Sequence, residues 1–210
     1  MSGSTSGIGL GIAQALARQG ASVMLNGFTD EETVQGLKRE LGALGVKVEY
    51  HPCDVTRPEQ VDAMVEAAVS AFGSLDILVN NAGIQHVAPV EQFPLEKWDA
   101  VIATNMSSAF YGMRRAVPLM RRRGWGRIIN TASQLAYKGS AGFAHYTAAK
   151  GAIISMTRSV ALEIGPRNVT INSVAPGATH TPILAGVPDD IMATIRAGIP
   201  RGRIAEVDEI

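Results

Sequence analysis

The segment Ser2–Gly9 reads SGSTSGIG, and an Ala-rich pattern that predicts a helix follows it from Leu10 to Gln19. Because glycine has no side chain, the glycines of such a turn let backbone amides at a helix N-terminus come close to a bound pyrophosphate. A flexible Gly/Ser tail is the plainer interpretation of the same letters. The apolar helical pattern that starts without a break at Ile8 argues against that interpretation.

Apolar strand patterns and helical patterns alternate along the rest of the chain. The predicted strands are Ala21–Asn26, Val46–Cys53, Ile77–Val79, Gly126–Ala132 and Val169–Val174. The predicted helices are Glu31–Gly42, Arg57–Phe72, Trp98–Arg123 and Tyr146–Gly165. This alternation predicts one α/β domain over residues 1–210, a doubly wound Rossmann-type parallel sheet with helices on both faces.

A buried strand normally precedes a glycine turn of this kind, but only Met1 stands before it here. That first strand lies in the middle of a doubly wound sheet. We therefore expect the first strand to be missing, which leaves its neighbours with unpaired backbone groups around an open apolar slot.

Composition excludes several classes of function. The 210 residues are 46% hydrophobic and 18% charged, with 19 basic and 19 acidic side chains, so no net field draws the chain to nucleic acid or to an anionic membrane. The only cysteine, Cys53, fits a reducing cytoplasm, and no signal peptide or membrane-spanning run is recognisable. The four histidines have no metal-ligand spacing, so we expect no metal site.

Tyr146 and Lys150 stand four residues apart, so on a helix their side chains are neighbours. An ammonium beside a phenol favours the phenolate and lowers the phenol pKa from its usual value of about 10. Ser133, thirteen residues earlier (146 − 133), could hydrogen-bond an oxygen that gains charge. Together these groups suit proton transfer at a carbonyl or alcohol, although the pair alone could be an ordinary surface pair of a helix.

Further motifs support the catalytic interpretation. Asn105 stands 28 residues before Ser133 (133 − 105), and Asn80–Gly83 reads NNAG. Over essentially its whole length the chain resembles the short-chain dehydrogenase/reductase family. The resemblance implies that Tyr146 exchanges a proton while Lys150 lowers its pKa and holds the nicotinamide ribose. It also implies that Ser133 polarises the substrate oxygen and that Asn105 holds a water of the proton relay.

The resemblance implies a nicotinamide dinucleotide as cofactor. Asn26, nineteen residues after Gly7 (26 − 7), is neither the acid that binds a ribose 2′-hydroxyl nor an arginine for a 2′-phosphate. The acids at 30–32 would repel a 2′-phosphate, which favours NAD over NADP, although they also suit a helix N-terminus. Asp54 has an alternative role as a helix cap. The expected cofactor contacts are Gly3, Ser6, Gly7, Ile8, Gly9, Asn26, Asp54, Val55, Asn81, Ala82, Gly83, Tyr146, Lys150, Pro176, Gly177 and Thr181.

Two groups within the family are most similar. The stretches NGF at 26–28 and RGWGRIIN at 123–130 resemble D-3-hydroxybutyrate dehydrogenases, whose carboxylate-binding glutamine matches Gln85. The histidine and lysine of that group fall at Leu135 and Phe143, and the second half of the chain is closer to 3-oxoacyl-carrier-protein reductases. We therefore expect an oxidoreductase of secondary alcohols and ketones, acting on a 3-hydroxy acid or a 3-oxoacyl compound. The expected substrate contacts are Gln85, Ser133, Tyr146 and a mobile loop over 182–200.

The helix predicted from Tyr146 is apolar or small nearly all round, so we expect its second face to meet a partner subunit in a homodimer or homotetramer. The segment 201–210 resembles the start of the family's last helix and strand, so we expect a chain shortened at both ends. If the missing first strand abolishes catalysis, the alternative function is a nucleotide-binding or subunit-pairing module.

Overall fold

The computed structural model describes residues 1–165, 168–184, 187 and 189–210. Its strands are β1 (Val23–Leu25), β2 (Val48–Tyr50), β3 (Ile77–Asn80), β4 (Gly126–Thr131) and β5 (Val169–Val174). Strand β1 pairs with β2, β3 with β4, and β4 with β5, and all three pairs are parallel. The prediction of an α/β fold with parallel strands is confirmed.

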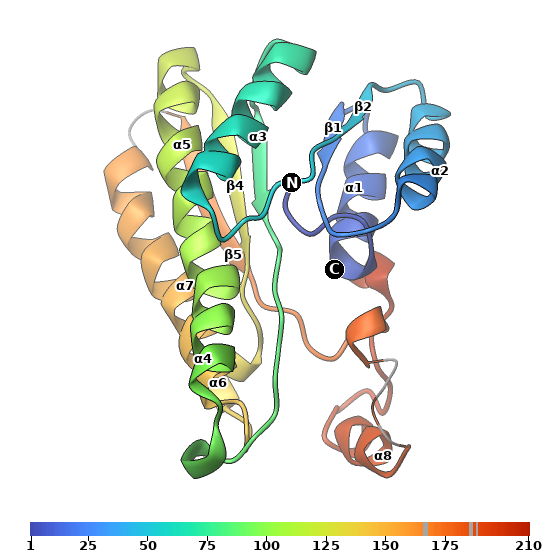
Figure 1. The fold of residues 1–210 in the computed structure, drawn as a ribbon, viewed down its shortest axis with the longest axis vertical. Helices are drawn as coiled ribbons and strands as arrows, with labels where there is room; N and C mark the ends of the chain where they lie inside the picture. Colours follow the sequence, from blue (N-terminus) through green and yellow to red (C-terminus); the bar gives the residue numbers. More distant parts are fainter. Residues whose placement is uncertain (166–167, 185–186, 188) are drawn as a thin grey trace.

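Helices flank these strands. They are α1 (Gly7–Arg18), α2 (Glu31–Gly42), α3 (Pro58–Phe72), α4 (Leu95–Ile102), α5 (Ser108–Arg123), α6 (Leu135–Lys138), α7 (Ala144–Ile164) and α8 (Asp189–Ala197). Helix α5 packs on β3 and β4, α7 on β4 and β5, α1 on β1, and α2 on β2. Figure 1 shows two groups of elements, with α1, α2, β1 and β2 on one side and β3–β5 with α5 and α7 on the other.

Several elements differ from their prediction, and three of these differences involve helices near the cleft or its expected substrate loop. Helix α1 begins at Gly7 rather than at residue 10, because the backbone is already helical directly after extended Ser6. The helix predicted over 98–123 begins at Leu95 and is interrupted by a π-helical turn, η2 (Ala103–Ser107). The predicted substrate loop over 182–200 contains the 3₁₀ turn η4 (Pro182–Leu184) and helix α8, while its residues 185–186 and 188 lie outside the described part.

Strands β1 and β3 belong to two separate sheets, with orders β1-β2 and β3-β4-β5. Residues 1–4 pass between their ends: the Met1 amine donates to Met24 O at 2.8 Å, and Ser2 N donates to Val79 O at 3.0 Å. Behind Met1 lies a cavity of about 280 Å³, lined by β1, β3, α1 and α3. An open apolar slot therefore separates β1 from β3. Figure 1 marks the N-terminus between the two groups.

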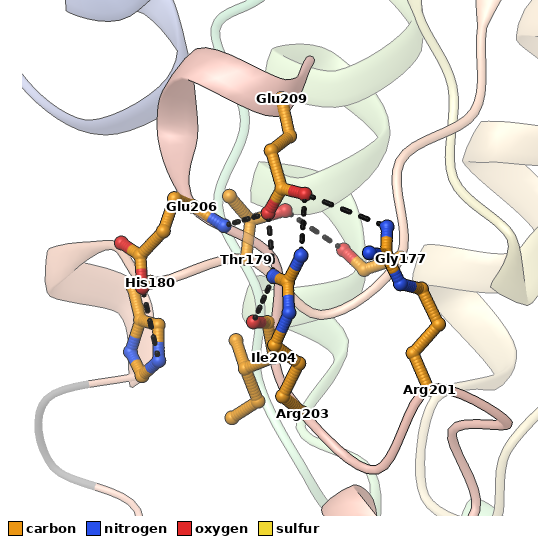
Figure 2. Close-up of polar contacts among 8 residues, drawn as sticks. All are labelled: Gly177, Thr179, His180, Arg201, Arg203, Ile204, Glu206 and Glu209. Carbon is orange, nitrogen blue, oxygen red and sulfur yellow. Dashed lines mark hydrogen bonds and ion pairs between the residues drawn. The ribbon is translucent and has the colours of Figure 1, made fainter.

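The C-terminal segment is held by a network of charges (Figure 2). The carboxylate of Glu209 accepts two hydrogen bonds from the Arg203 guanidinium, at 2.6 and 2.7 Å, and one from Glu206 N at 2.8 Å. The 3₁₀ turn η5 (Val207–Glu209), which contains this glutamate, packs on α1. These donors lower the pKa of Glu209 to about 2, with the Arg203 hydrogen bond as the largest cause.

Replacing Glu209 by glutamine is expected to lower the Tm at pH 7, because the charged bonds to Arg203 are lost. A carboxylate whose pKa is lowered on folding stabilises the fold above its unfolded pKa, here 4.5, and that stabilisation is lost as the pH falls towards about 2. The Tm difference between wild type and Glu209→Gln should therefore shrink from pH 5 to pH 2 in a series of thermal melts. Glu66→Gln, which removes a surface ion pair with Arg115 at 2.7 Å, is the matched control and should show a smaller difference at neutral pH.

Candidate active site

The glycine turn packs so closely on its neighbours that side chains are excluded. A Cβ at Gly3, whose φ is +58°, would lie 2.8 Å from Ala82 Cα, and a Cβ at Gly9 would overlap the carbonyl oxygen of Gly3. Gly7 has a φ of +53°, a conformation that favours glycine. The turn therefore presents backbone at the N-terminus of α1, where a phosphate is favoured by amides and by the helix dipole.

Residues on both sides hold this turn in place. The hydroxyl of Ser2 accepts hydrogen bonds from the backbone amides of Asn81 and Ala82 at 3.0 and 3.1 Å. The side chain of Asn81 donates to Gly3 O at 2.8 Å. The NNAG segment thus fixes the position of the turn relative to β3. This role of the Ser2 hydroxyl was not predicted.

A cleft of about 570 Å³ opens in front of the turn. Of the predicted cofactor contacts, it is lined by Gly3, Ser6, Gly7, Ile8, Gly9, Asn26, Asp54, Val55, Asn81, Ala82, Gly83, Tyr146, Lys150 and Thr181. Pro176 and Gly177 do not line it; Gly177 lies on a separate hollow beside Gln134. The cleft runs from the helix N-terminus to the Tyr146–Lys150 pair, and its glycine cradle fits an extended dinucleotide.

The side chain of Asn26 is occupied by structural bonds. Its amide group donates to His51 O at 3.1 Å and to Cys53 O at 2.9 Å, and its oxygen accepts from Gly3 N at 3.2 Å. It therefore joins the ends of β1 and β2 to the turn, and all its hydrogen-bonding groups already have partners. Asn26 also lines the cleft, so its contact with a ribose hydroxyl stays a prediction.

Asp54 closes a local turn. Its carboxylate accepts from the backbone and hydroxyl of Thr56 at 2.9 and 2.7 Å, and these bonds lower its pKa. The alternative role as a cap of α3 is wrong, because the N-cap of that helix is Arg57 and has no side-chain bond. In the described residues that line the cleft, Asp54 is the only carboxylate.

Tyr146 and Lys150 line one end of the cleft, and Ser133, which does not line it, lies next to Tyr146. Tyr146 and Lys150 lie on α7, and the Lys150 ammonium is 5.8 Å from the centroid of the Tyr146 ring. Lys150 is 3% exposed and donates to Thr131 O at 2.6 Å. Ser133, which follows the end of β4, hydrogen-bonds the Tyr146 phenol. The predicted grouping of the three side chains is therefore present.

The pKa of the phenol differs from the prediction. Burial raises the pKa of Tyr146 above 10, and the hydrogen bond with Ser133 offsets part of that rise. Burial also lowers the pKa of Lys150 to about 8. The expectation that Lys150 lowers the Tyr146 pKa is therefore wrong in this structure. The ammonium faces the ring and the Thr131 carbonyl, and desolvation outweighs its charge.

Asn105 lies in the π-helical turn η2 and is 2% exposed. Its oxygen accepts from Ile84 N and its nitrogen donates to Ile84 O, both at 2.9 Å. It thereby fixes the backbone that follows the NNAG segment, next to Gln85 in the cleft wall. In the described structure, Asn105 positions this wall. Such π-helical turns occur frequently at functional sites.

An aromatic contact joins the cleft wall to the start of α7. His145 is fully buried and packs on Phe93 with ring centroids 4.2 Å apart, and His86 meets the same ring at 5.5 Å. Burial, followed by the charge of His86, lowers the pKa of His145. The contact with Phe93 joins residues far apart in the sequence and was not predicted.

Neither a metal-binding cluster nor a membrane-spanning helix is found in the described residues. In the described ranges, no cluster of histidine, cysteine and acidic side chains could hold a metal ion. Over the same part of the chain, every helix is too short or too polar to cross a membrane. Cys53 is buried, which raises the pKa of its thiol to about 11 and disfavours the reactive thiolate.

Comparison with known proteins gives consistent matches. The family model described as "Enoyl-(Acyl carrier protein) reductase" matches residues 3–210. A D-beta-hydroxybutyrate dehydrogenase of Cupriavidus necator is 48% identical over 88% of this chain and 71% of its own length. Another from Rhizobium meliloti is 44% identical over 90% of this chain and 74% of its own. Nodulation protein G of Azospirillum brasilense is 39% identical over the whole chain and 85% of its own length.

Proposed function

Because this chain belongs to the short-chain dehydrogenase/reductase family, we propose that it interconverts a secondary alcohol and a ketone at the Tyr146 end of the cleft. The observation that carries the proposal is the position of Tyr146 and buried Lys150 at one end of a cleft whose other end is a glycine cradle, with Ser133 beside the Tyr146 phenol. A nicotinamide dinucleotide bound in the cleft would supply or accept the hydride. The glycine turn, the NNAG segment and Lys150 are the residues that would hold it.

Tyr146 is the proton donor to the ketone oxygen. Its raised pKa keeps the phenol protonated at neutral pH, which suits donation during reduction. Ser133 hydrogen-bonds the same oxygen and stabilises the charge that develops there. Lys150 places its ammonium against the ring face and, with a pKa of about 8, is mainly charged at pH 7. Asn105 acts through the loop that it fixes and is a positioning residue.

We propose that NAD is preferred over NADP. The support comes from the described residues that line the cleft. At the far end these include Thr5, Ser6, Gly27 and Phe28, none of which is a cation. Lys150 is the only lysine or arginine among the described lining residues, and it lies at the Tyr146 end. The acids at 30–32, which entered the sequence argument, do not line the cleft, and Asp30 instead caps α2 through Thr33 N. A 2′-phosphate would therefore be desolvated without a counter-charge.

Fluorescence titration of the purified chain is expected to give a Kd for NADPH at least tenfold above that for NADH. Phe28→Arg should lower the ratio of the Kd for NADPH to the Kd for NADH. The Phe28 side chain is 80% exposed at the lip of the cleft, so an arginine at this position can reach a 2′-phosphate. Phe110→Arg, a 49% exposed position on α5 that does not line the cleft, is the control and should leave the ratio unchanged. Tighter NADPH binding by the wild type would refute the preference.

For the substrate, we propose a 3-oxoacyl compound or its 3-hydroxy counterpart in which the carboxyl group is masked as an ester or thioester. Phe143 stands edge-on to Tyr146 with ring centroids 6.3 Å apart, so an apolar ring rather than a cation covers one side of the Tyr146 ring. A free carboxylate there would lose charge-assisted hydrogen bonds worth about 1.5–3 kcal/mol each. Gln85, which also lines the cleft, remains as a neutral donor.

An assay with NAD and a matched pair of substrates tests this preference. The methyl ester of 3-hydroxybutyrate should be oxidised with a kcat/KM at least tenfold above that of the free acid. Phe143→Lys should raise the activity towards the acid selectively, because it supplies a cation beside the phenol. Faster turnover of the free acid by the wild type would show that the carboxylate is recognised after all.

We also propose that the active form is a homodimer or homotetramer that uses the outer face of α7. Leu162 on this helix is 86% exposed, and its neighbours one or two turns away, Ser155, Arg158 and Ser159, are also exposed. Ser155 and Ser159 leave room beside Leu162 for a partner helix to approach this face. Leu162→Glu should shift the molar mass measured by light scattering towards that of the monomer.

The alternative function, a binding module without catalysis, predicts NADH binding without turnover of any alcohol or ketone.

A further inference from the structure

Three buried polar side chains form a polar bridge from the sheet β3-β4-β5 to helix α7. Asn80 Nδ2 of β3 donates to Asn130 Oδ1 of β4 at 2.8 Å, and Asn130 Nδ2 donates to Thr157 Oγ1 of α7 at 3.0 Å. The Thr157 hydroxyl donates in turn to Ile153 O at 2.8 Å. The bridge therefore joins the strand that ends at the NNAG segment to the helix that carries the tyrosine–lysine pair.

The polar bridge lies away from solvent. Asn130 is fully buried, and Asn80 and Thr157 are also buried. A buried amide or hydroxyl that loses its partner costs free energy, so each of these side chains holds its neighbour in place. The Thr157 hydroxyl gives its only hydrogen to Ile153 O and is therefore free to accept from the Asn130 amide. The position of α7 over β4 thus depends on this hydroxyl.

The same helix is bound to the same strand at a second point. The Lys150 ammonium donates to the carbonyl of Thr131, the residue directly after Asn130. Lys150 and Thr157 stand seven residues apart (157 − 150), which is about two turns of a helix, so they share one face of α7. A displacement of α7 at Thr157 would also move the backbone that carries Lys150, because both residues belong to one continuous helix.

The surroundings of Lys150 make its pKa a measure of that position. Its ammonium faces the Tyr146 ring of its own helix and the neutral Thr131 carbonyl of β4. Burial lowers the pKa of Lys150 to about 8. An ammonium that is held less closely against β4 is better hydrated, and hydration favours its charged form. The Lys150 pKa should therefore rise when α7 is released from β4.

We propose that Thr157 is a positioning residue of the candidate active site and acts through Lys150. Its hydroxyl, bound to the Asn130 amide, holds α7 where the Lys150 ammonium reaches the Thr131 carbonyl. This inference rests on the proposed function, because the position of Lys150 affects turnover only if the chain is an alcohol–ketone oxidoreductase. The bridge goes on through Asn130 to Asn80, so the helix is fixed relative to the NNAG segment as well.

Thr157→Val tests the proposal, because it replaces the hydroxyl by a methyl group of similar size and leaves the Asn130 amide without this acceptor. We expect kcat for the reduction of methyl 3-oxobutanoate at saturating NADH to fall about tenfold, with KM within about twofold of wild type, because catalysis tolerates only small displacements of its groups. NMR titration of the Lys150 side chain in the cofactor-free chain should give a pKa that rises from about 8 towards 10.5.

Matched variants separate positioning from stability. Thr157→Ser keeps the hydroxyl and should restore the wild-type kcat and Lys150 pKa. Ile164→Val shortens a fully buried side chain on the same helix, away from the polar bridge, and should lower the Tm without changing either readout. If Thr157→Val does not fold, Thr157→Cys, whose thiol is a weak acceptor, is the milder variant and should move both readouts in the same direction.

Three results would overturn the proposal. Thr157→Val with the wild-type kcat and Lys150 pKa would show that the bridge does not position the lysine. The same changes in Ile164→Val would indicate a general loosening of α7, and a loss in Thr157→Ser would show that the hydroxyl is not the cause. A wild type that binds NADH but reduces no ketone would instead refute the proposed function. In that event a raised Lys150 pKa in Thr157→Val would still support the bridge, and an unchanged one would overturn it.

Discussion

Tyr146→Phe is expected to lower kcat for ketone reduction by about 10³-fold, within the range of general acid catalysis, and to leave the Kd for NADH within about twofold of wild type. The reason is that phenylalanine keeps the ring against Lys150 and Phe143 but has no proton to donate. Stopped-flow or steady-state assays with NADH give kcat, and fluorescence titration gives the Kd. Tyr137→Phe on α6, where the side chain is 69% exposed, is the matched control and should retain full activity.

The pH dependence separates the two directions of the reaction. A phenol with a pKa above 10 is protonated at neutral pH, so reduction has its proton donor throughout the range from pH 6 to 8. Alcohol oxidation needs the phenolate, so its rate should rise with pH over the same range. Turnover by Tyr146→Phe at the wild-type rate, or an oxidation rate that falls as pH rises from 6 to 8, would contradict the role of Tyr146.

The sequence predicted local features of the fold well. The bounds of α2 (Glu31–Gly42) and β5 (Val169–Val174) match the prediction, because each has a clear pattern and clear ends, with Asp30 as the cap of α2. The strands β1 and β2 are shorter than predicted. Apolar residues continue beyond the paired part of these strands, and sequence pattern shows burial rather than hydrogen bonding.

Features that depend on tertiary contacts were harder to predict from the sequence. The π-helical turn at Asn105 arises where the side chain binds the backbone of Ile84, a residue from a different segment. The Tyr146 pKa was predicted in the wrong direction because the effect of a neighbouring charge was counted while the cost of burial was not. Helix α8 lies in the segment 182–200 that was predicted to be a loop.

Gly9→Ala is expected to have the largest effect of any single methyl group on cofactor binding. The added Cβ would overlap Gly3 O and lie 2.6 Å from Asn81 Nδ2, so the bond that joins the turn to the NNAG segment must break. Overpacking of this kind costs about 1–3 kcal/mol, and a displaced turn no longer presents its amides to a phosphate. We expect the Kd for NADH to rise on the order of 10²-fold, which fluorescence titration would measure.

A second glycine separates this steric effect from a general effect of alanine in helices. Gly36 lies in α2, and nothing within 4 Å would meet its Cβ. Gly36→Ala should therefore raise stability by about 0.5–1 kcal/mol, through the higher helix propensity of alanine, and leave NADH binding unchanged. If Gly9→Ala also raised the Tm and kept the wild-type Kd for NADH, the close contact of Gly9 with Gly3 would not determine the shape of the glycine turn. The dinucleotide would then have to bind without support from this turn.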